Sequence, residues 1–156
     1  MKKLLGLSER DGERVLRAVL DTNVIVSGTI QNAGNSFTIL EAWGKDVFIL
    51  IVSSALIDEI KRVFYYPKIR KKYKITEKQI RGVIRNLRNY SIMTPGKLKL
   101  HVIKRDPQDN EVLIAALEGN ADYIVSGDYD LKELKSYKGI RIVSPAEFVK
   151  LLEDLN

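Results

Sequence analysis

Short apolar runs that alternate with helix-like segments are the feature that most constrains how this chain can fold. Strand-like runs lie at residues 15–20, 47–52, 123–126 and 140–143. Between them, apolar residues recur at the spacing of an amphipathic helix. Parallel strands need a crossover of this kind, whereas antiparallel strands can join through a tight turn. The alternation therefore predicts an α/β domain with a mostly parallel sheet.

Capping residues and prolines indicate where several of the helices begin and end. Ser53 or Ser54 is the expected N-cap of a helix that runs to about Tyr65 and is stopped by Pro67. Thr76 is the expected N-cap of the next helix. The complete expectation is helices at 36–43, 54–65, 76–89, 107–118, near 129 and from 144 onwards, with two extended pieces at 91–93 and 99–103.

The chain is long enough for one compact domain with its own core. It has 156 residues, of which 45% are apolar. We expect a loosely held N-terminal segment over residues 1–14 and a single domain over residues 15–156. No stretch approaches the roughly 20 apolar residues of a membrane span, and the apolar part of the start is too short for a signal peptide. These features predict a cytoplasmic protein that does not enter the membrane.

Missing residue types exclude several kinds of active site. The chain has no cysteine and one histidine, His101, which we interpret as structural. Disulfides, thiolate nucleophiles, zinc–cysteine sites and catalysis by Ser–His or Cys–His pairs are therefore excluded, as are metal sites built on several imidazoles. Chemistry in this chain must depend on carboxylates, lysines or hydroxyl groups.

The net charge of +6 is concentrated in one segment. Residues 61–88 hold 11 Lys and Arg against a single acid, so the rest of the chain is slightly acidic. A basic segment of this kind favours a polyanion such as RNA, although it is equally typical of a solvated surface. Tyr65, Tyr66 and Tyr73 are candidates for stacking on unpaired bases or for packing at the rim. Four cations recur at helical spacing opposite an apolar stripe: Lys78, Arg81, Arg85 and Arg88.

Polar residues that follow the predicted strands are the first candidates for a site, because ligands of parallel sheets bind outside the carboxyl ends of the strands. Asp21 directly follows the run at 15–20, and Asn23 comes two residues later. We interpret the two as a metal-facing pair. A second interpretation, in which Asp21 only caps a turn through its own backbone, stays open.

Asp128 and Asp130 follow another strand end. Ser126 closes the run at 123–126 just before them. No base is in sight to activate Ser126 as a nucleophile, so we expect it to orient a carboxylate or a water. Asp128 or Asp130 can alternatively cap the short helix expected near residue 129.

Glu59 is a candidate because of its position on its helix. At 100° per residue it lies at the margin of the apolar arc, whereas Asp58 points nearly opposite and should be solvated. Taken alone, Glu59 is better explained as a surface residue paired with Arg62.

Asp109 should point inward, because it shares a helical face with Val112 and Leu113. Asp106 precedes Pro107 and has a structural use as the N-cap. A buried carboxylate needs a partner, since an unpaired buried charge is expensive. Several carboxylates at one edge of a sheet would repel one another without a cation, and Mg²⁺ or Mn²⁺ suits such oxygen ligands.

Four motifs, taken in order, resemble the PIN-domain family, and within it the toxin components of toxin–antitoxin systems. The resemblance covers the chain from about residue 17 to 152. It rests on VLDTNV at 19–24, SSALIDEI at 53–60, DNEVLIAA at 109–116 and IVSGDYD at 124–130.

The resemblance implies a three-layer α/β/α fold around a five-stranded, mostly parallel sheet. It also implies an endoribonuclease that depends on Mg²⁺ or Mn²⁺, an antitoxin protein as partner, and a homodimer. The basic insert after Tyr65 is longer than in the smallest members, and the spacing before Ile114 leaves Asp106 as an alternative to Asp109. The family's invariant acids fall on Asp21, Glu59, Asp109 and Asp128, with Asn23 and Ser126 as its smaller polar positions.

Two other functions compete with a ribonuclease. A phosphatase of the haloacid-dehalogenase kind would use Asp21 as nucleophile, but it would want a second aspartate where Asn23 stands. A non-catalytic module that binds RNA or protein is the other alternative, because a fold does not guarantee chemistry.

Overall fold

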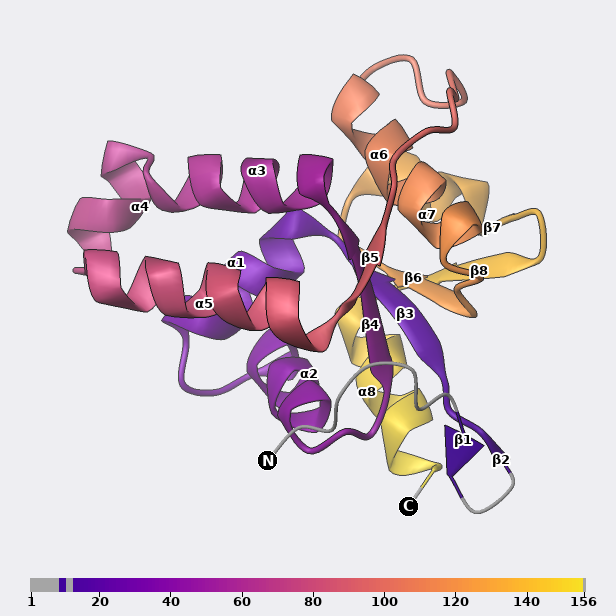
Figure 1. Cartoon of the computed structure of the whole chain (residues 1–156), viewed down its shortest axis with the longest axis horizontal. Coiled ribbons are helices and arrows are strands. Elements are labelled where there is room, and N and C mark those ends of the chain that lie inside the picture. The colour runs from indigo at the N-terminus through magenta and orange to yellow at the C-terminus, as the bar shows by residue number, and fades with distance from the viewer. Residues whose placement is uncertain (1–8, 11–12, 156) are drawn as a thin grey trace.

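The computed structural model describes residues 9–10 and 13–155 (Figure 1). A six-stranded sheet with the order β5-β4-β3-β6-β8-β7 forms the centre of the molecule. Its strands are β3 (Arg17–Leu20), β4 (Ile49–Ser53), β5 (Ile92–Thr94), β6 (Tyr123–Val125), β7 (Ser136–Tyr137) and β8 (Ile140–Val143).

Five of these strands run parallel, and β7 pairs antiparallel with β8 at one edge. The five-stranded parallel sheet expected from the family resemblance is thus present, with one short antiparallel strand added. The first described residues form a separate pair of two-residue strands, β1 (Glu9–Arg10) and β2 (Glu13–Arg14). The prediction of a loosely held segment over 1–14 falls mainly on residues outside the described ranges.

Helices cover both faces of the sheet. On one face, α6 packs on β3, β4 and β6. The other face carries α1, α2 and α8, with α2 packed against both (Figure 1). The helices are α1 (Thr22–Ile30), α2 (Asn35–Gly44), α3 (Ser54–Phe64), α4 (Pro67–Lys72), α5 (Glu77–Tyr90), α6 (Pro107–Glu118), α7 (Tyr129–Leu134) and α8 (Pro145–Glu153).

Capping confirms most of the predicted helix starts. Ser53 accepts a hydrogen bond from the backbone N–H of Leu56, and Thr76 and Ser144 each form a capping box. A capped start satisfies backbone donors that a helix leaves unpaired. These local signals explain why α3, α5 and α8 begin where the sequence predicts.

Beyond residue 14, three elements were not predicted: α1, α4 and β7. One prediction is wrong, because residues 99–103 form no strand. His101 accordingly lies exposed in an irregular segment and not in a strand. The backbone of Ile103 instead pairs with the side chain of Asn110, which replaces a neighbouring strand.

The core lies between the sheet and its helices. Trp43 and Phe48 are buried. The ring of Phe48, directly before β4, meets that of Phe148 in α8 edge-on, with 5.2 Å between the centroids. Within the described part of the chain, no helix has the length and apolar content needed to cross a membrane.

Candidate active site

The central strands β3 and β6 bring the first candidate residues together. They are parallel neighbours in which Leu20 is opposite Val125, so Asp21 and Ser126 emerge side by side at the carboxyl edge of the sheet. The backbone N–H of Asp21 donates to the carbonyl of Val125 at 2.9 Å. This edge is where ligands of parallel sheets bind.

Asp21 is buried and its carboxylate is held at both oxygens. Oδ1 accepts from the backbone N–H of Thr22, as the N-cap of α1, and Oδ2 accepts from the hydroxyl of Ser126, each at 2.7 Å. Burial raises its pKa, as do the nearby carboxylates of Asp128 and Asp106, although the two hydrogen bonds oppose the shift. Asp21 is therefore a cap, as one interpretation expected, and also a member of an acidic edge.

Ser126 connects two of the acids. Its hydroxyl donates to Asp21 and accepts from the backbone N–H of Asp128 at 2.9 Å. The side chain is fully buried. These two hydrogen bonds fix Asp21 and the start of α7 relative to each other, which is consistent with the predicted orienting role of Ser126.

The closest group of carboxylates contains Asp109, Asp128 and Asp130, called the acidic trio below. One ligand oxygen from each lies within 4.8 Å of the other two. Asp109 comes from the first turn of α6, whereas Asp128 is the N-cap of α7 and Asp130 lies in its first turn. Two helix starts thus aim three acids at one point.

Asp109 is the most constrained member of the trio. Its side chain is 5% exposed, as the helical-face argument predicted, and Oδ2 is buried without a hydrogen-bond partner. Burial raises its pKa to about 8, helped by the negative charges of Asp128, Asp21 and Asp106. An unpartnered buried carboxylate oxygen beside two further carboxylates is a fit for a divalent cation with oxygen ligands.

Asp106 and Asp109, the two candidates for the third acid, occupy different environments. Asp106 is the exposed N-cap of α6 and accepts from the backbone N–H of Gln108 at 3.0 Å. It lies outside the acidic trio. Asp109 is therefore the better placed of the two for a buried metal.

Glu59 and Asn23 are not drawn into the trio. Glu59 is half-buried on α3 and pairs with Arg62, with 2.9 Å between Oε2 and the guanidinium. Asp58 is exposed, as predicted. Asn23 is also exposed, one residue into α1, so it does not share the buried position of Asp21.

The three helices α3, α4 and α5 form an arm that projects to one side of the sheet (Figure 1). On α5 the four predicted cations Lys78, Arg81, Arg85 and Arg88 are all exposed. The opposite stripe is turned inward, with Ile80 and Leu87 buried. The amphipathic interpretation of this helix is thus confirmed.

The tyrosines of the arm differ in their surroundings. The Tyr65 hydroxyl donates to both carboxylate oxygens of Glu77, and the Arg70 guanidinium lies 5.0 Å from its ring centroid. Tyr65 is therefore engaged in packing. Tyr66 and Tyr73 are exposed.

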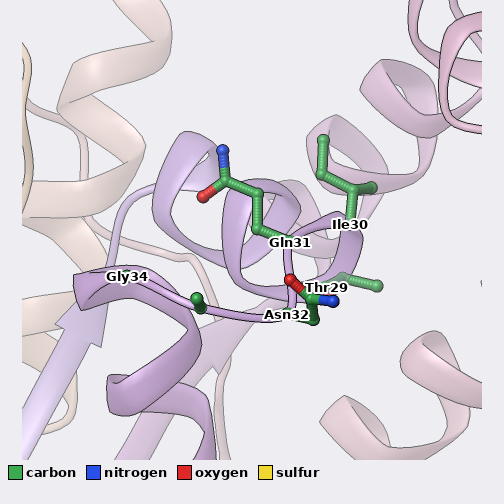
Figure 2. Close-up of a pocket in the computed structure, with 6 residues that line it drawn as sticks. Thr29, Ile30, Gln31, Asn32 and Gly34 are labelled. Carbon is green, nitrogen blue, oxygen red and sulfur yellow. The ribbon is translucent and has the colours of Figure 1, made fainter.

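A hollow of about 710 Å³ lies apart from the acids, at the turn between α1 and α2. Figure 2 shows that the end of α1 and the turn after it line this hollow, with the side chains of Ile30 and Gln31 projecting from neighbouring positions. None of the candidate carboxylates lines it.

Arg105 was not considered from the sequence, yet its guanidinium lies 3.5 Å from Oδ1 of Asp130. No periodic pattern points to it, because it lies in an irregular segment. The sequence predicts Asp130 after a strand end or as a cap of the helix near residue 129, and the structure places it in the trio.

Comparison with known proteins finds similarity to a protein family, to a relative and to a solved structure. The family model described as PIN domain matches residues 17–130. An uncharacterized protein of Methanocaldococcus jannaschii is 27% identical over 146 residues, which cover 88% of this chain and 92% of that protein. The crystal structure of VapBC2 from Rickettsia felis, bound to a DNA fragment from the promoter, contains a chain of similar fold. The TM-score is 0.55 at 16% identity, over 83% of this chain and 98% of that one.

Proposed function

The chain belongs to the PIN domain family, and from that premise we propose that it is a metal-dependent endoribonuclease that cleaves single-stranded RNA. One observation carries the proposal: the acidic trio, in which Asp109 keeps a buried oxygen without a hydrogen-bond partner. Repulsion among carboxylates so close together is relieved by a cation bound between them.

In this proposal Asp109, Asp128 and Asp130 hold Mg²⁺ or Mn²⁺. Such an ion supplies a Lewis acid for a phosphate oxygen and lowers the pKa of a bound water. Asp21 completes the acidic edge, and Ser126 keeps its carboxylate directed there through the 2.7 Å hydrogen bond. Preorganisation of this kind matters because ligands held by second partners need no rearrangement when the ion binds.

Glu59 remains a proposed member of the site from the family resemblance alone. Its pair with Arg62 involves one carboxylate oxygen, and the Arg62 side chain is 55% exposed and therefore free to move. Asn23 and Asp106 are proposed as supporting residues at the rim, where both are exposed.

Four exposed cations on α5 are proposed to bind the RNA backbone. Phosphate contacts from Lys78, Arg81, Arg85 and Arg88 would supply affinity without reading sequence. We also propose a homodimer, an antitoxin protein as partner and a cytoplasmic location, all of which follow from the family resemblance.

Of the two alternatives, the phosphatase is disfavoured by the surroundings of Asp21. Both of its oxygens accept hydrogen bonds and the side chain is 9% exposed. A nucleophile needs a free oxygen that faces the phosphorus atom. An RNA-cleavage experiment distinguishes the ribonuclease from the second alternative, the non-catalytic binding module.

The test is cleavage of end-labelled single-stranded RNA with Mg²⁺, Mn²⁺ or EDTA. We expect cleavage to require the metal and to fall at least about 100-fold in Asp21→Asn and Asp109→Asn, since Asp109 loses a charge of the trio and Asp21 loses a charge of the acidic edge. Asp58→Asn is the matched control, because Asp58 is an exposed acid. A folded wild type that binds RNA but cuts none with either metal would identify the chain as a binding module.

A further inference from the structure

We propose that Arg105 and Tyr129 form a subsite for one unpaired nucleotide, in which the tyrosine ring stacks on the base and the guanidinium binds its phosphate. This subsite rests on the proposed ribonuclease function and gives it a substrate preference. Both residues adjoin Asp130: Tyr129 precedes it in α7, and Arg105 contacts its carboxylate.

Tyr129 is an aromatic ring left in water beside the acids. It is 68% exposed, more than any other large hydrophobic residue in the described chain. The residues on either side of it, Asp128 and Asp130, both direct their carboxylates into the trio. A ring this exposed contributes little to the core, so its position points to a contact with something outside the fold.

An unpaired base is the partner that suits such a ring. Every base has a π-face, and stacking on an aromatic side chain contributes about 1–3 kcal/mol per base. A base inside a duplex is already stacked and paired, so it is not available to the ring. Tyr129 therefore favours single-stranded over double-stranded RNA.

Arg105 supplies the charge that a phosphate needs. Its side chain is 79% exposed and lies 3.5 Å from Asp130, whose side chain is 18% exposed. An exposed pair at this distance holds the guanidinium weakly. Arg105 can therefore turn to a phosphate oxygen, which it can bind through two parallel hydrogen bonds.

The segment that carries Arg105 is irregular, but its backbone is fixed at two points. The carboxylate of Glu118 accepts from three successive backbone N–H groups, those of Gly96, Lys97 and Leu98, at 2.7, 2.8 and 3.2 Å. Nearer to Arg105, the side chain of Asn110 binds both the N–H and the carbonyl of Ile103, at 2.9 and 2.7 Å.

These anchors limit where Arg105 can go. Ile103 is buried two residues before it, and Asp106 begins the cap of α6 directly after it. The backbone on either side of Arg105 is thus fixed, while its side chain is exposed and reaches Asp130. This combination suits a residue that positions substrate.

The experiment uses a short single-stranded RNA that contains 2-aminopurine, whose fluorescence is quenched by stacking on an aromatic ring. Binding is measured to the full chain with Ca²⁺ present, and a gel confirms that the RNA stays intact. We expect quenching with wild type and Tyr129→Phe. In Tyr129→Ala we expect quenching to disappear and the Kd to rise roughly 5- to 100-fold, with no change for duplex RNA.

Arg105 is tested by the salt dependence of the same binding. We expect Arg105→Ala to lower the slope of log K against log salt by about 0.7, the contribution of one phosphate contact on a single strand, and Arg105→Lys to keep it. Arg141→Ala is the matched control. Arg141 is an exposed arginine that pairs in register with Tyr123 at the start of β6, away from the carboxyl edge.

The outcomes separate this subsite from the nuclease itself. Quenching that survives Tyr129→Ala, or that disappears in Tyr66→Ala or Tyr73→Ala instead, overturns the subsite and moves the stacking to the arm. A wild type that cleaves RNA without quenching overturns the subsite alone. A wild type that quenches through Tyr129 without cleaving in Mg²⁺ or Mn²⁺ supports the subsite and contradicts the ribonuclease.

Discussion

Ser126 connects two of the candidate acids, because its single hydroxyl group forms a hydrogen bond with each of them. It donates to Oδ2 of Asp21 and accepts from the backbone N–H of Asp128, and it has no exposed surface. A carboxylate buried away from water stays ionised only if hydrogen-bond donors offset the cost of burying its charge. The position of Asp21 at the acidic edge is therefore set by a neutral residue.

Ser126→Ala should weaken both the fold and the activity. We expect RNA cleavage to fall roughly 10- to 100-fold, as when a partner of a metal ligand is removed. The free energy of unfolding should fall by about 1–3 kcal/mol, since the oxygen of Asp21 loses its partner in a buried position. Cleavage rates and urea unfolding measure the two effects.

Ser91→Ala is the matched control for that substitution. Ser91 is equally buried, but its hydroxyl has no hydrogen-bond partner. Its removal should leave cleavage unchanged and leave stability unchanged or slightly higher. If Ser91→Ala and Ser126→Ala behave alike, the hydrogen bonds of Ser126 are not the cause of its effect.

The protonation of Asp109 predicts a pH dependence of stability. Its pKa of about 8 in the fold compares with an ordinary value of 3.8. Between these two values the folded chain binds more protons than the unfolded one, so the free energy of unfolding falls as pH rises. We expect this decline from about pH 4 to pH 8 in EDTA, measured by urea unfolding.

Asp109→Asn should flatten that profile, because the amide mimics the protonated acid and does not titrate. Excess Mn²⁺ should also flatten it in the wild type, since the ion replaces the proton between the carboxylates. A decline that persists unchanged in Asp109→Asn would assign the titration to another group. Asp58→Asn, on an exposed acid, should leave the profile as in the wild type.

At the scale of elements, the close approach of α1 and α2 depends on a glycine. A Cβ added to Gly28 would lie 2.6 Å from the backbone oxygen of Ser36 and 2.7 Å from Leu40. Backbone cannot move aside as a flexible side chain can, so the two helices would have to separate. Asp21 caps α1, and any shift of that helix is transmitted to the acidic edge.

Gly28→Ala should therefore destabilise the chain by about 1–3 kcal/mol, the usual cost of overpacking. Gly82→Ala is the matched control on α5, where a Cβ would meet nothing within 4 Å. It should stabilise by about 0.5–1 kcal/mol, because alanine is the better helix former. Thermal unfolding of the two variants should give shifts of opposite sign, and equal signs would contradict the packing argument.

Elements with local signals were predictable, and those without them were not. Helices α3 and α5 have a cap and an apolar stripe on one side. Helix α1 has neither a stripe nor good helix formers, because β-branched residues fill it and its apolar residues are buried almost all round. Helix α4 is a single short basic stretch, and Pro67, which was interpreted only as a stop for α3, begins it.

The same distinction applies to the candidate site. Strand ends predict where Asp21 and Asp128 emerge, and a helical face predicts that Asp109 is buried. The sequence does not reveal which side chains finally meet. Glu59 lies beside Arg62 one turn along its helix, whereas Asp130 reaches the trio through the tight start of α7.

At the scale of the whole molecule, opposite charges are separated. The acidic trio lies near the carboxyl edge of the sheet, and a cluster of cations lies on the arm formed by α3, α4 and α5. An acidic centre alone would repel RNA until a metal neutralised it. A basic arm on the same body attracts the backbone of the strand and raises the local concentration of substrate.

This separation predicts that RNA affinity and metal affinity can be changed independently. Replacement of Lys78, Arg81, Arg85 and Arg88 by glutamine should lower the salt slope of single-strand binding by up to about 2.8, or about 0.7 for each phosphate that the variant no longer neutralises. Mn²⁺ affinity, measured by calorimetry, should stay within about twofold, because salt screens the exposed charges of the arm.

A control with the same change of charge shows whether the position of the cations matters. Lys45, Lys138, Arg141 and Lys150 are also exposed, but they lie outside the arm. If their replacement by glutamine lowers the salt slope as much as the arm variant does, RNA senses only the net charge of +6. If the arm variant alone lowers it, the strand lies along α5, and the cations that bind it belong to a different part of the fold from the acids proposed to cut it.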